Sequence, residues 1–321
     1  SEATETAGEN VKAPFELLKG GINGLDKVVL RSDRGSSAEV LLYGGQVISW
    51  KNEHGEELLF VSHKTNFKPP SPIRGGISIC FPQFSNHGPL EQHGFARKRV
   101  WNIDASPPPF PNSSPNKTFV DLILKSSDDD MKIWPHSFEF RLRVTLGPSG
   151  DLMMTSRIRN TQTDGKPFTF TMAYHAYFSV SDISEVRVEG LETLDYLDNM
   201  QNKERFTEQG DAITFENEVD RVYLSTPKIA ILDHEKKRTF VVRKDGLPDA
   251  IVWNPWEKKS KAMNDMGDDE YKYMLCVGPA TIENAVSLKP GEEWKGRQEL
   301  SLVPSSYRSG QLNPGRVLRG S

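Results

Sequence analysis

The fold is decided by the stretch Phe138-Glu139-Phe140-Arg141-Leu142-Arg143-Val144-Thr145-Leu146, in which apolar and polar residues alternate without a fault. Successive side chains of a β-strand point to opposite faces, so this stretch predicts a strand with one buried and one solvated face. Further β-rich segments lie along the chain, separated by turns of glycine, proline and aspartate. They are 38–50, 58–61, 119–124, 152–159, 168–180, 228–232, 239–243, 250–253 and 273–277.

No run of helical periodicity lies between these strands, which disfavours a parallel βαβ sheet. We predict an all-β protein, a large antiparallel β-sandwich that forms one domain over residues 14–303. A disordered leader (1–13) is expected before it and a C-terminal tail (304–321) after it. One short helix is expected within 256–266. The charged clusters Asp128-Asp129-Asp130 and Glu257-Lys258-Lys259 are expected to be solvated turns.

The composition narrows the classes of function. The 321 residues include 40 Lys and Arg against 44 Asp and Glu, so the net charge of −4 argues against nucleic acid or an anionic membrane as partner. No apolar run approaches the roughly 18 residues of a membrane helix. The polar, acidic start lacks the features of a secretory signal or transit peptide. We therefore expect a cytoplasmic monomer, in which Cys80 and Cys276 are reduced core residues.

Two segments in the first third of the chain combine a cation with glycine. In Arg74-Gly75-Gly76 the glycines allow the backbone to approach a ligand closely, and the guanidinium can grip an anion. An exposed arginine before a flexible turn is the alternative. Gln92-His93-Gly94-Phe95-Ala96-Arg97 offers donors and acceptors for a polyol, or else forms a solvated basic turn. His87 and His93 lack further metal ligands at a recognised spacing, so we expect no metal.

Two strands add a histidine and a carboxylate. Along 168–178, period-two alternation assigns Phe168, Phe170, Met172, Tyr174, Ala176 and Phe178 to the core face. His175 falls on the other face, where it either lines a ligand cleft or is a structural histidine. Asp220, at the start of another strand, can accept hydrogen bonds from sugar hydroxyls or pair with Arg221.

Five motifs follow one another in an order that is more specific than any one of them. They are Arg74-Gly75-Gly76-Ile77 with Cys80-Phe81-Pro82-Gln83-Phe84, Gln92-His93-Gly94-Phe95-Ala96-Arg97, Glu218-Val219-Asp220, Trp253-Asn254-Pro255-Trp256 and Pro290-Gly291-Glu292-Glu293-Trp294. With them the chain, from about residue 14 to 315, resembles the glucose-6-phosphate 1-epimerase (hexose-6-phosphate mutarotase) branch of the aldose 1-epimerase family. The resemblance implies a β-sandwich of the galactose-mutarotase type.

The resemblance also implies roles for single residues. Arg74 and Arg97 are expected to hold the phosphate of a hexose 6-phosphate. Gln92 and Asp220 are expected to bind the sugar, and His175 to be the catalytic acid. His93 is a weaker candidate for the same pocket.

One position departs from the family. In relatives a catalytic glutamate lies twelve residues before the Pro-Gly of the last motif, and here that position is Gly278. Glu283 is the nearest acid, but its odd offset of five residues places it on the opposite face of an unbroken strand. It is therefore a weak replacement base.

Anomer interconversion needs one group that protonates the ring oxygen and one that deprotonates the C1 hydroxyl, so no cofactor is implied. The first hypothesis is a hexose-6-phosphate mutarotase. The second is a sugar-phosphate-binding protein with weakened turnover, in which Gly278→Glu is expected to raise activity sharply. An epimerase for unphosphorylated aldoses and a metal-dependent β-sandwich isomerase remain as further alternatives.

Overall fold

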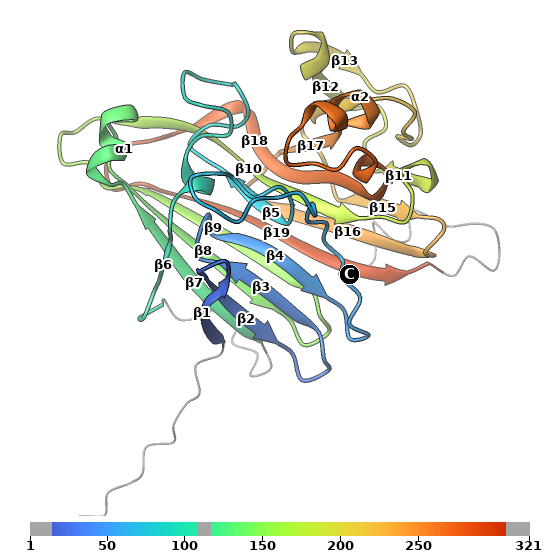
Figure 1. Cartoon of the computed structure of the whole chain (residues 1–321). Helices are drawn as coiled ribbons and strands as arrows, with labels where there is room; N and C mark the ends of the chain where they lie inside the picture. Colours follow the sequence, from blue (N-terminus) through green and yellow to red (C-terminus); the bar gives the residue numbers. More distant parts are fainter. Residues whose placement is uncertain (1–14, 108–116, 306–321) are drawn as a thin grey trace, which may run out of the picture.

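The structure is a computed structural model that describes residues 15–107 and 117–305. It consists of two antiparallel sheets that pack against each other (Figure 1). The larger sheet contains, in spatial order, β1 (Glu16–Ile22), β2 (Leu25–Arg31), β3 (Ser37–Leu41), β4 (Gln46–Lys51), β5 (Ile77–Cys80), β10 (Phe168–Ser179), β18 (Met274–Leu288), β17 (Asp249–Asn254), β14 (Val219–Tyr223), β12 (Asp195–Asp198) and β13 (Glu204–Thr207).

The smaller sheet contains β11 (Val186–Glu189), β15 (Ile229–Asp233), β16 (Arg238–Asp245), β19 (Glu293–Pro304), β9 (Leu152–Asn160), β8 (Phe138–Leu146), β7 (Thr118–Lys125) and β6 (Asn102–Ile103). Short helices complete the described part: α1 (Asp128–Ile133), α2 (Trp256–Ala262) and the 3₁₀ helices Ala96–Lys98, Ile183–Glu185, Asn199–Gln201 and Glu270–Tyr273. The predicted antiparallel all-β fold is confirmed, as is a short helix within 256–266.

The core lies between the sheets and follows the predicted alternation. In β8 the apolar residues are buried, and Glu139, Arg141 and Arg143 between them are partly exposed. Thr145, the last polar residue of the strand, is buried as well. In β10 all six residues assigned to the core face lie in the main apolar cluster. Phe81 packs edge-on against Phe138 and Phe140 at 5.1 Å between ring centroids. The residues of β10 that alternate with these six, His175 among them, point to the opposite face of the sheet.

The segment 38–50, expected as one strand, is two strands joined by a tight turn. Gly44 and Gly45 have positive φ, and a Cβ on Gly45 would lie 2.9 Å from the indole of Trp101. Only glycine allows both the left-handed backbone and this close approach. The turn lets β3 and β4 pair as neighbours in the larger sheet.

The cluster Asp128-Asp129-Asp130 is not the solvated turn that we expected, because it forms the first turn of α1. Ser127 and Asp130 cap each other reciprocally at the start of the helix. Asp130 is 1% exposed, and the Nε of Arg99 donates to its Oδ1 at 2.7 Å. A local capping box and one distant arginine therefore convert an acidic run into helix.

Two sequence-based expectations concern the ends of the chain. The expected leader (1–13) lies outside the described residues, as does the expected tail beyond Ser305.

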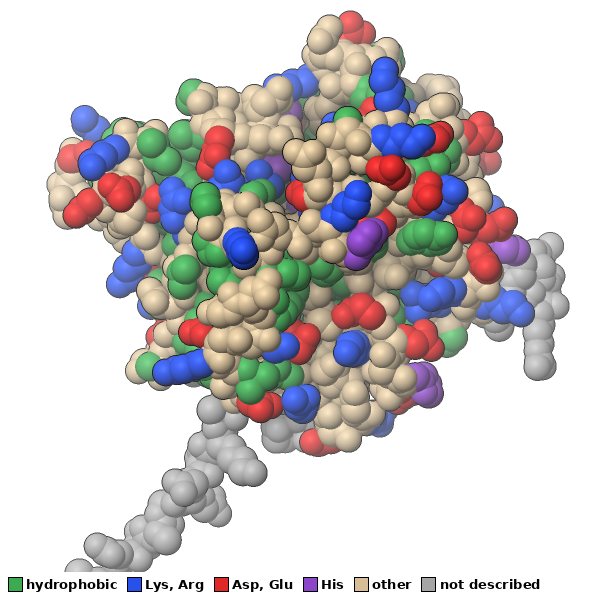
Figure 2. Space-filling view, viewed as in Figure 1, with side chains coloured by type: hydrophobic (Ala, Val, Ile, Leu, Met, Phe, Trp, Pro, Cys, Tyr) green, Lys and Arg blue, Asp and Glu red, His purple; other side chains and the backbone are tan. Residues whose placement is uncertain are grey.

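Cys80 and Cys276 are buried and free, as predicted. No helix in the described ranges is long and apolar enough to cross a membrane. On the face shown in Figure 2, acidic and basic side chains are intermixed and form no large patch of one sign.

The capping arrangement of α1 leads to a test of stability. Asp130→Ala removes a cap and a buried charge-assisted hydrogen bond, so we expect the free energy of unfolding to fall by about 2–3 kcal/mol. Asp129→Ala is the matched control, because the Asp129 side chain is 90% exposed; its effect is expected within about 0.5 kcal/mol. Urea denaturation measures both. Equal losses in the two variants would contradict the assignment.

Candidate active site

A polar cavity lies on the face of the larger sheet that turns away from the core. Its volume is about 200 Å³. Its lining comes from segments far apart in the sequence, and a narrow extension toward Pro72 shares four of the residues. The main cavity is lined by Arg74, Phe84, Ser85, Gln92, His93, Arg97, His175, Asp220, Ile251, Trp253, Lys259 and Met263. All six positions expected to bind or transform the sugar are therefore brought together.

The register of four adjacent strands builds the floor of this cavity. Tyr177 of β10 pairs with Cys276 of β18, Cys276 pairs with Trp253 of β17, and Trp253 pairs with Asp220 of β14. Residues paired across antiparallel strands point to the same face. His175 lies two residues from Tyr177 on β10 and therefore shares that face.

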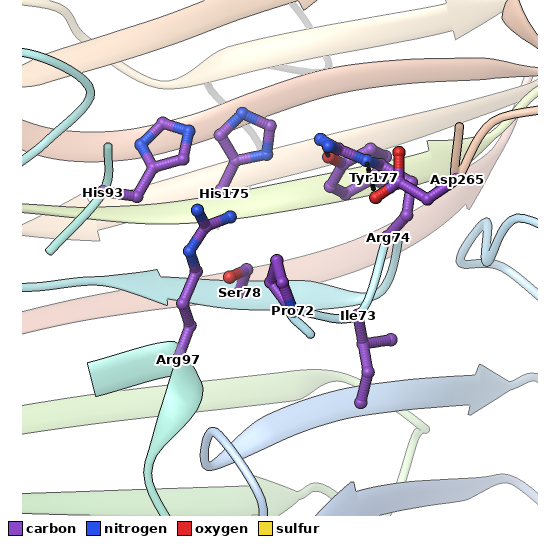
Figure 3. Close-up of a pocket in the computed structure, with 9 residues that line it drawn as sticks. All are labelled: Pro72, Ile73, Arg74, Ser78, His93, Arg97, His175, Tyr177 and Asp265. Carbon is purple, nitrogen blue, oxygen red and sulfur yellow. Dashed lines mark hydrogen bonds and ion pairs between the residues drawn. The ribbon is translucent and has the colours of Figure 1, made fainter. Parts of the chain in front are cut away.

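Arg74 occupies one side of the cavity (Figure 3). Its Nε donates to Oδ2 of Asp265 at 3.1 Å and its Nη1 donates to the hydroxyl of Tyr177 at 3.0 Å. The two glycines that follow pack against neighbouring backbone and do not line the cavity. A Cβ on Gly75 would lie 2.4 Å from the Cα of Val61, so these glycines let the segment press against neighbouring backbone and fix where Arg74 emerges.

The segment 92–97 supplies the opposite side. His93 has a φ of +65°, and its Nδ1 accepts a hydrogen bond from the backbone N–H of Ser85 at 2.9 Å. Arg97 lies in the 3₁₀ helix Ala96–Lys98, and its Nη2 donates to the carbonyl of Gln92 at 3.0 Å. Gln92 is exposed at the rim. Gln92, His93 and Arg97 of this segment line the cavity, so the segment is not merely a solvated basic turn.

His175 is 7% exposed and lies among other rings. The centroid of its imidazole lies 5.0 Å from the ring of Tyr177, 5.4 Å from His93 and 5.6 Å from Trp253. Burial, together with the positive charges of Arg74 and Arg97, lowers its pKa to about 3. The imidazole is therefore neutral at physiological pH, whereas an unperturbed histidine has a pKa near 6.5.

Asp220 contributes a carboxylate on the far side of the floor. The Nδ2 of Asn199 donates to its Oδ1 at 2.9 Å. Burial raises the pKa of this carboxyl above its usual value. The ion pair with Arg221, which we considered as an alternative, does not form, since Arg221 instead contacts Glu208 and the hydroxyl of Tyr223. Asp220 thus remains directed to the cavity.

Gly278 occupies the position next to His175 on the neighbouring strand. Ala173 pairs with Ala280 and Tyr177 pairs with Cys276, with no shift of register between these two pairs. Gly278 therefore lies opposite His175. A Cβ built on Gly278 would lie 1.6 Å from the carbonyl oxygen of Tyr174. The backbones of β18 and β10 therefore approach each other closely at Gly278, and no side chain fits there without a shift of the strand.

Glu283 gains no support as a replacement base. It does not line either described part of the cavity. Its Oε1 accepts a hydrogen bond from Nη1 of Arg205 at 2.9 Å, near the edge strands β12 and β13. Glu283 lies where the pairing of β18 with β10 shifts register, between Thr281 and Val286, so strand alternation alone does not set its orientation. The ion pair with Arg205 holds its carboxylate outside the cavity.

Sequence reasoning missed several lining residues. Lys259 was assigned to a solvated turn but lies on α2 and lines the cavity. Asp265 and Met263 follow the same helix, and nothing in the local pattern marks them as ligand-facing. Trp253 and Tyr177 had weak signals, the first within a motif and the second as a same-face neighbour of His175. In the described ranges, no group of three His, Cys, Asp or Glu side chains is placed to hold a metal ion.

Two antiparallel sheets, with a polar cavity on the outer face of the larger one, define a β-sandwich of the galactose-mutarotase type. The family model for aldose 1-epimerase matches residues 26–301. The chain belongs to the aldose 1-epimerase family, a family of epimerases that act at the anomeric carbon of sugars.

Comparisons with single proteins agree with this assignment. A protein of Cenchrus ciliaris named "Putative glucose-6-phosphate 1-epimerase" is 67% identical over 96% of this chain and 94% of its own length. The crystal structure of a "putative mutarotase" from Salmonella typhimurium superposes with a TM-score of 0.79 at 28% identity, over 92% of this chain and 96% of that one. A galactose mutarotase-like protein from Clostridium acetobutylicum shares the fold, with a TM-score of 0.70 at 18% identity and coverage of 90% and 98%.

The close contact at Gly278 leads to a test of the backbone. Gly278→Ala forces a Cβ against the carbonyl of Tyr174, so we expect a loss of about 3 kcal/mol in the free energy of unfolding. Gly147→Ala is the control, because its Cβ would meet its nearest neighbour at 3.6 Å, an ordinary contact; a change within about 1 kcal/mol is expected. Chemical denaturation of both variants checks this. A fully stable Gly278→Ala protein would contradict the close approach.

The low pKa of His175 leads to a test of pH dependence. The unfolded chain has a histidine pKa of about 6.5 and the folded protein one of about 3. The unfolded state therefore binds more protons below pH 6.5, and the contribution of His175 to stability, complete above that pH, falls by about 2 kcal/mol at pH 5. We expect His175→Gln to remove this part of the pH dependence and His54→Gln, at an exposed site, to retain it. Parallel curves for wild type and His175→Gln would refute the low pKa.

Proposed function

We propose that the cavity binds a hexose 6-phosphate and interconverts its α and β anomers. The observation that carries this proposal is the meeting of two guanidinium groups with one buried imidazole around a single cavity. Arginine donates paired hydrogen bonds to phosphate oxygens, so Arg74 and Arg97 favour a phosphorylated sugar over a neutral one. The phosphate adds binding energy away from the reacting C1 atom.

The remaining polar residues suit the hydroxyl groups of a pyranose. Asp220 offers carboxylate oxygens on one side of the cavity, and Gln92 offers an amide at the rim. His93 accepts the Ser85 N–H through Nδ1, so in the neutral ring the proton is on Nε2 and is free for donation to a sugar oxygen. Trp253, which forms part of the floor, supplies an aromatic surface for the C–H groups of the ring.

In this proposal His175 protonates the ring oxygen of the sugar, using a proton that it first accepts. The imidazole starts neutral because its pKa is lowered to about 3. It takes the proton of the C1 hydroxyl, the C1–O5 bond breaks as the C1–O1 double bond forms, and the same proton passes to O5. Rotation about C1–C2 and the reverse steps give the other anomer. Phosphate at Arg74 and Arg97 offsets the charges that disfavour the intermediate imidazolium.

A second candidate function is a sugar-phosphate-binding protein with weakened turnover, and the backbone at Gly278 favours it. The carboxylate that relatives use as base is absent here, and the loss of a positioned base costs about 10²–10⁴ in rate. The contact with Tyr174 changes one expectation from the sequence. Because a side chain at 278 requires β18 to shift, Gly278→Glu alone is not expected to restore the activity of relatives.

The decisive experiment follows the equilibration of freshly dissolved α-glucose 6-phosphate by NMR or polarimetry. We expect the wild-type protein to accelerate it above the blank, and His175→Ala to lose at least about 10²-fold of that acceleration. His54→Ala, which changes an exposed histidine, is expected to match the wild type. Glucose in place of glucose 6-phosphate tests the preference for the phosphate.

Each outcome separates the candidates. A wild-type rate equal to the blank at high protein concentration, with saturable calorimetric binding of glucose 6-phosphate, would leave the binding protein. Faster equilibration of glucose than of glucose 6-phosphate would favour an epimerase for unphosphorylated aldoses. Absence of both binding and acceleration would reject the proposal.

A further inference from the structure

Three cations line the cavity: Arg74, Arg97 and Lys259. They differ in how far carboxylates and hydrogen-bond partners within the protein already offset their charges. Arg74 is the best compensated, because it forms an ion pair with Asp265 and a hydrogen bond with Tyr177. A phosphate that approached Arg74 would have to share its guanidinium with a carboxylate. Arg74 alone is therefore a poor anchor for a dianion.

Arg97 is much less compensated. Its Nε is buried and has no hydrogen-bond partner among the described residues. Its Nη2 donates to a backbone carbonyl, which carries no full charge, and no ion pair of the described residues includes it. Burial lowers the pKa of this guanidinium, as expected for a charge that has lost water without gaining a carboxylate. An anion in the cavity would relieve this cost.

Lys259 is the third cation; it lies on α2 and lines the same cavity, with 45% of its side chain exposed. Its Nζ lies 3.7 Å from Oε1 of Glu218, which is longer than a hydrogen bond. Its charge partly opposes the rise that burial causes in the pKa of Asp220, and it adds to the lowering of the pKa of His93, which burial dominates. Lys259 therefore acts on groups at two sides of the cavity, and its weak partner leaves its ammonium donors available.

We propose that Lys259 binds the phosphate of the substrate together with Arg97 and so sets the preference for phosphorylated sugars. This inference rests on the proposed function, since it assigns the phosphate of that ligand to a place in the cavity. The long stem of lysine and its three donors suit a phosphate that Arg97 holds from another side. Arg74, which keeps its ion pair with Asp265, then contributes to the phosphate site as the weaker of the two arginines. The α2 segment thus acts as a specificity element.

Calorimetry on the whole chain tests the role of Lys259 by comparing variants of this residue with a variant of the neighbouring Lys258. Lys259→Met removes the charge and keeps the aliphatic stem, so we expect the Kd for glucose 6-phosphate to rise roughly tenfold to a hundredfold. The Kd for glucose is expected to stay within twofold. Lys258→Met is the matched control, because Lys258 lies on the same helix, is exposed and does not line the cavity; it is expected to bind like the wild type. Lys259→Arg should retain most of the affinity.

The outcomes distinguish this inference from the proposed function. Unchanged affinity of Lys259→Met for glucose 6-phosphate, with normal wild-type binding, would overturn the role of Lys259 and leave the proposed function standing. Equal weakening for glucose and glucose 6-phosphate would also overturn it, since Lys259 would then shape the cavity without reading the phosphate. If the wild-type protein binds no glucose 6-phosphate, the proposed function and this inference fail together.

Discussion

The structure depends on the position of β10 between β5 and β18 at the centre of the larger sheet. One face of this strand carries Phe168, Phe170, Met172, Tyr174, Ala176 and Phe178 into the core. That burial pins the register, because a slip by one residue would expose every one of these side chains. The other face must then present His175 and Tyr177 to the cavity. Core packing and active-site geometry are therefore two consequences of one strand.

The electrostatic character of the cavity follows from the burial of His175 and from the two arginines beside it. Arg74 precedes β5 and Arg97 lies in the 3₁₀ helix that follows it, and their charges act on a histidine that is already buried. Burial and both charges disfavour an imidazolium, so the cavity holds a neutral His175 beside two cations. Under the proposed function, a phosphate would offset the guanidinium charges and make a transient charge on His175 less costly.

Gly278 shows how one residue affects the spacing of two strands. The Tyr174 carbonyl occupies the direction that a side chain at 278 would take. The strands are consequently closer than a side chain at 278 permits. Under the proposed function, ring opening then relies on His175 as both acceptor and donor of the proton.

Much of this protein was determined by its sequence alone. Alternation in β8 and β10 specified the strands, the core face and the placement of His175 on the opposite face, because period two is a local property of an extended chain. The ordered motifs around Arg74, Gln92, Arg97 and Asp220 indicated which residues meet. Other features arise only from tertiary structure. Lys259 and Asp265 reach the cavity because α2 folds back over the sheet, Asp130 becomes buried because Arg99 packs against it, and Glu283 is held by Arg205. These contacts join residues distant in sequence, so no local pattern encodes them, and the pKa of His175 likewise depends on burial and charges that only the assembled fold supplies.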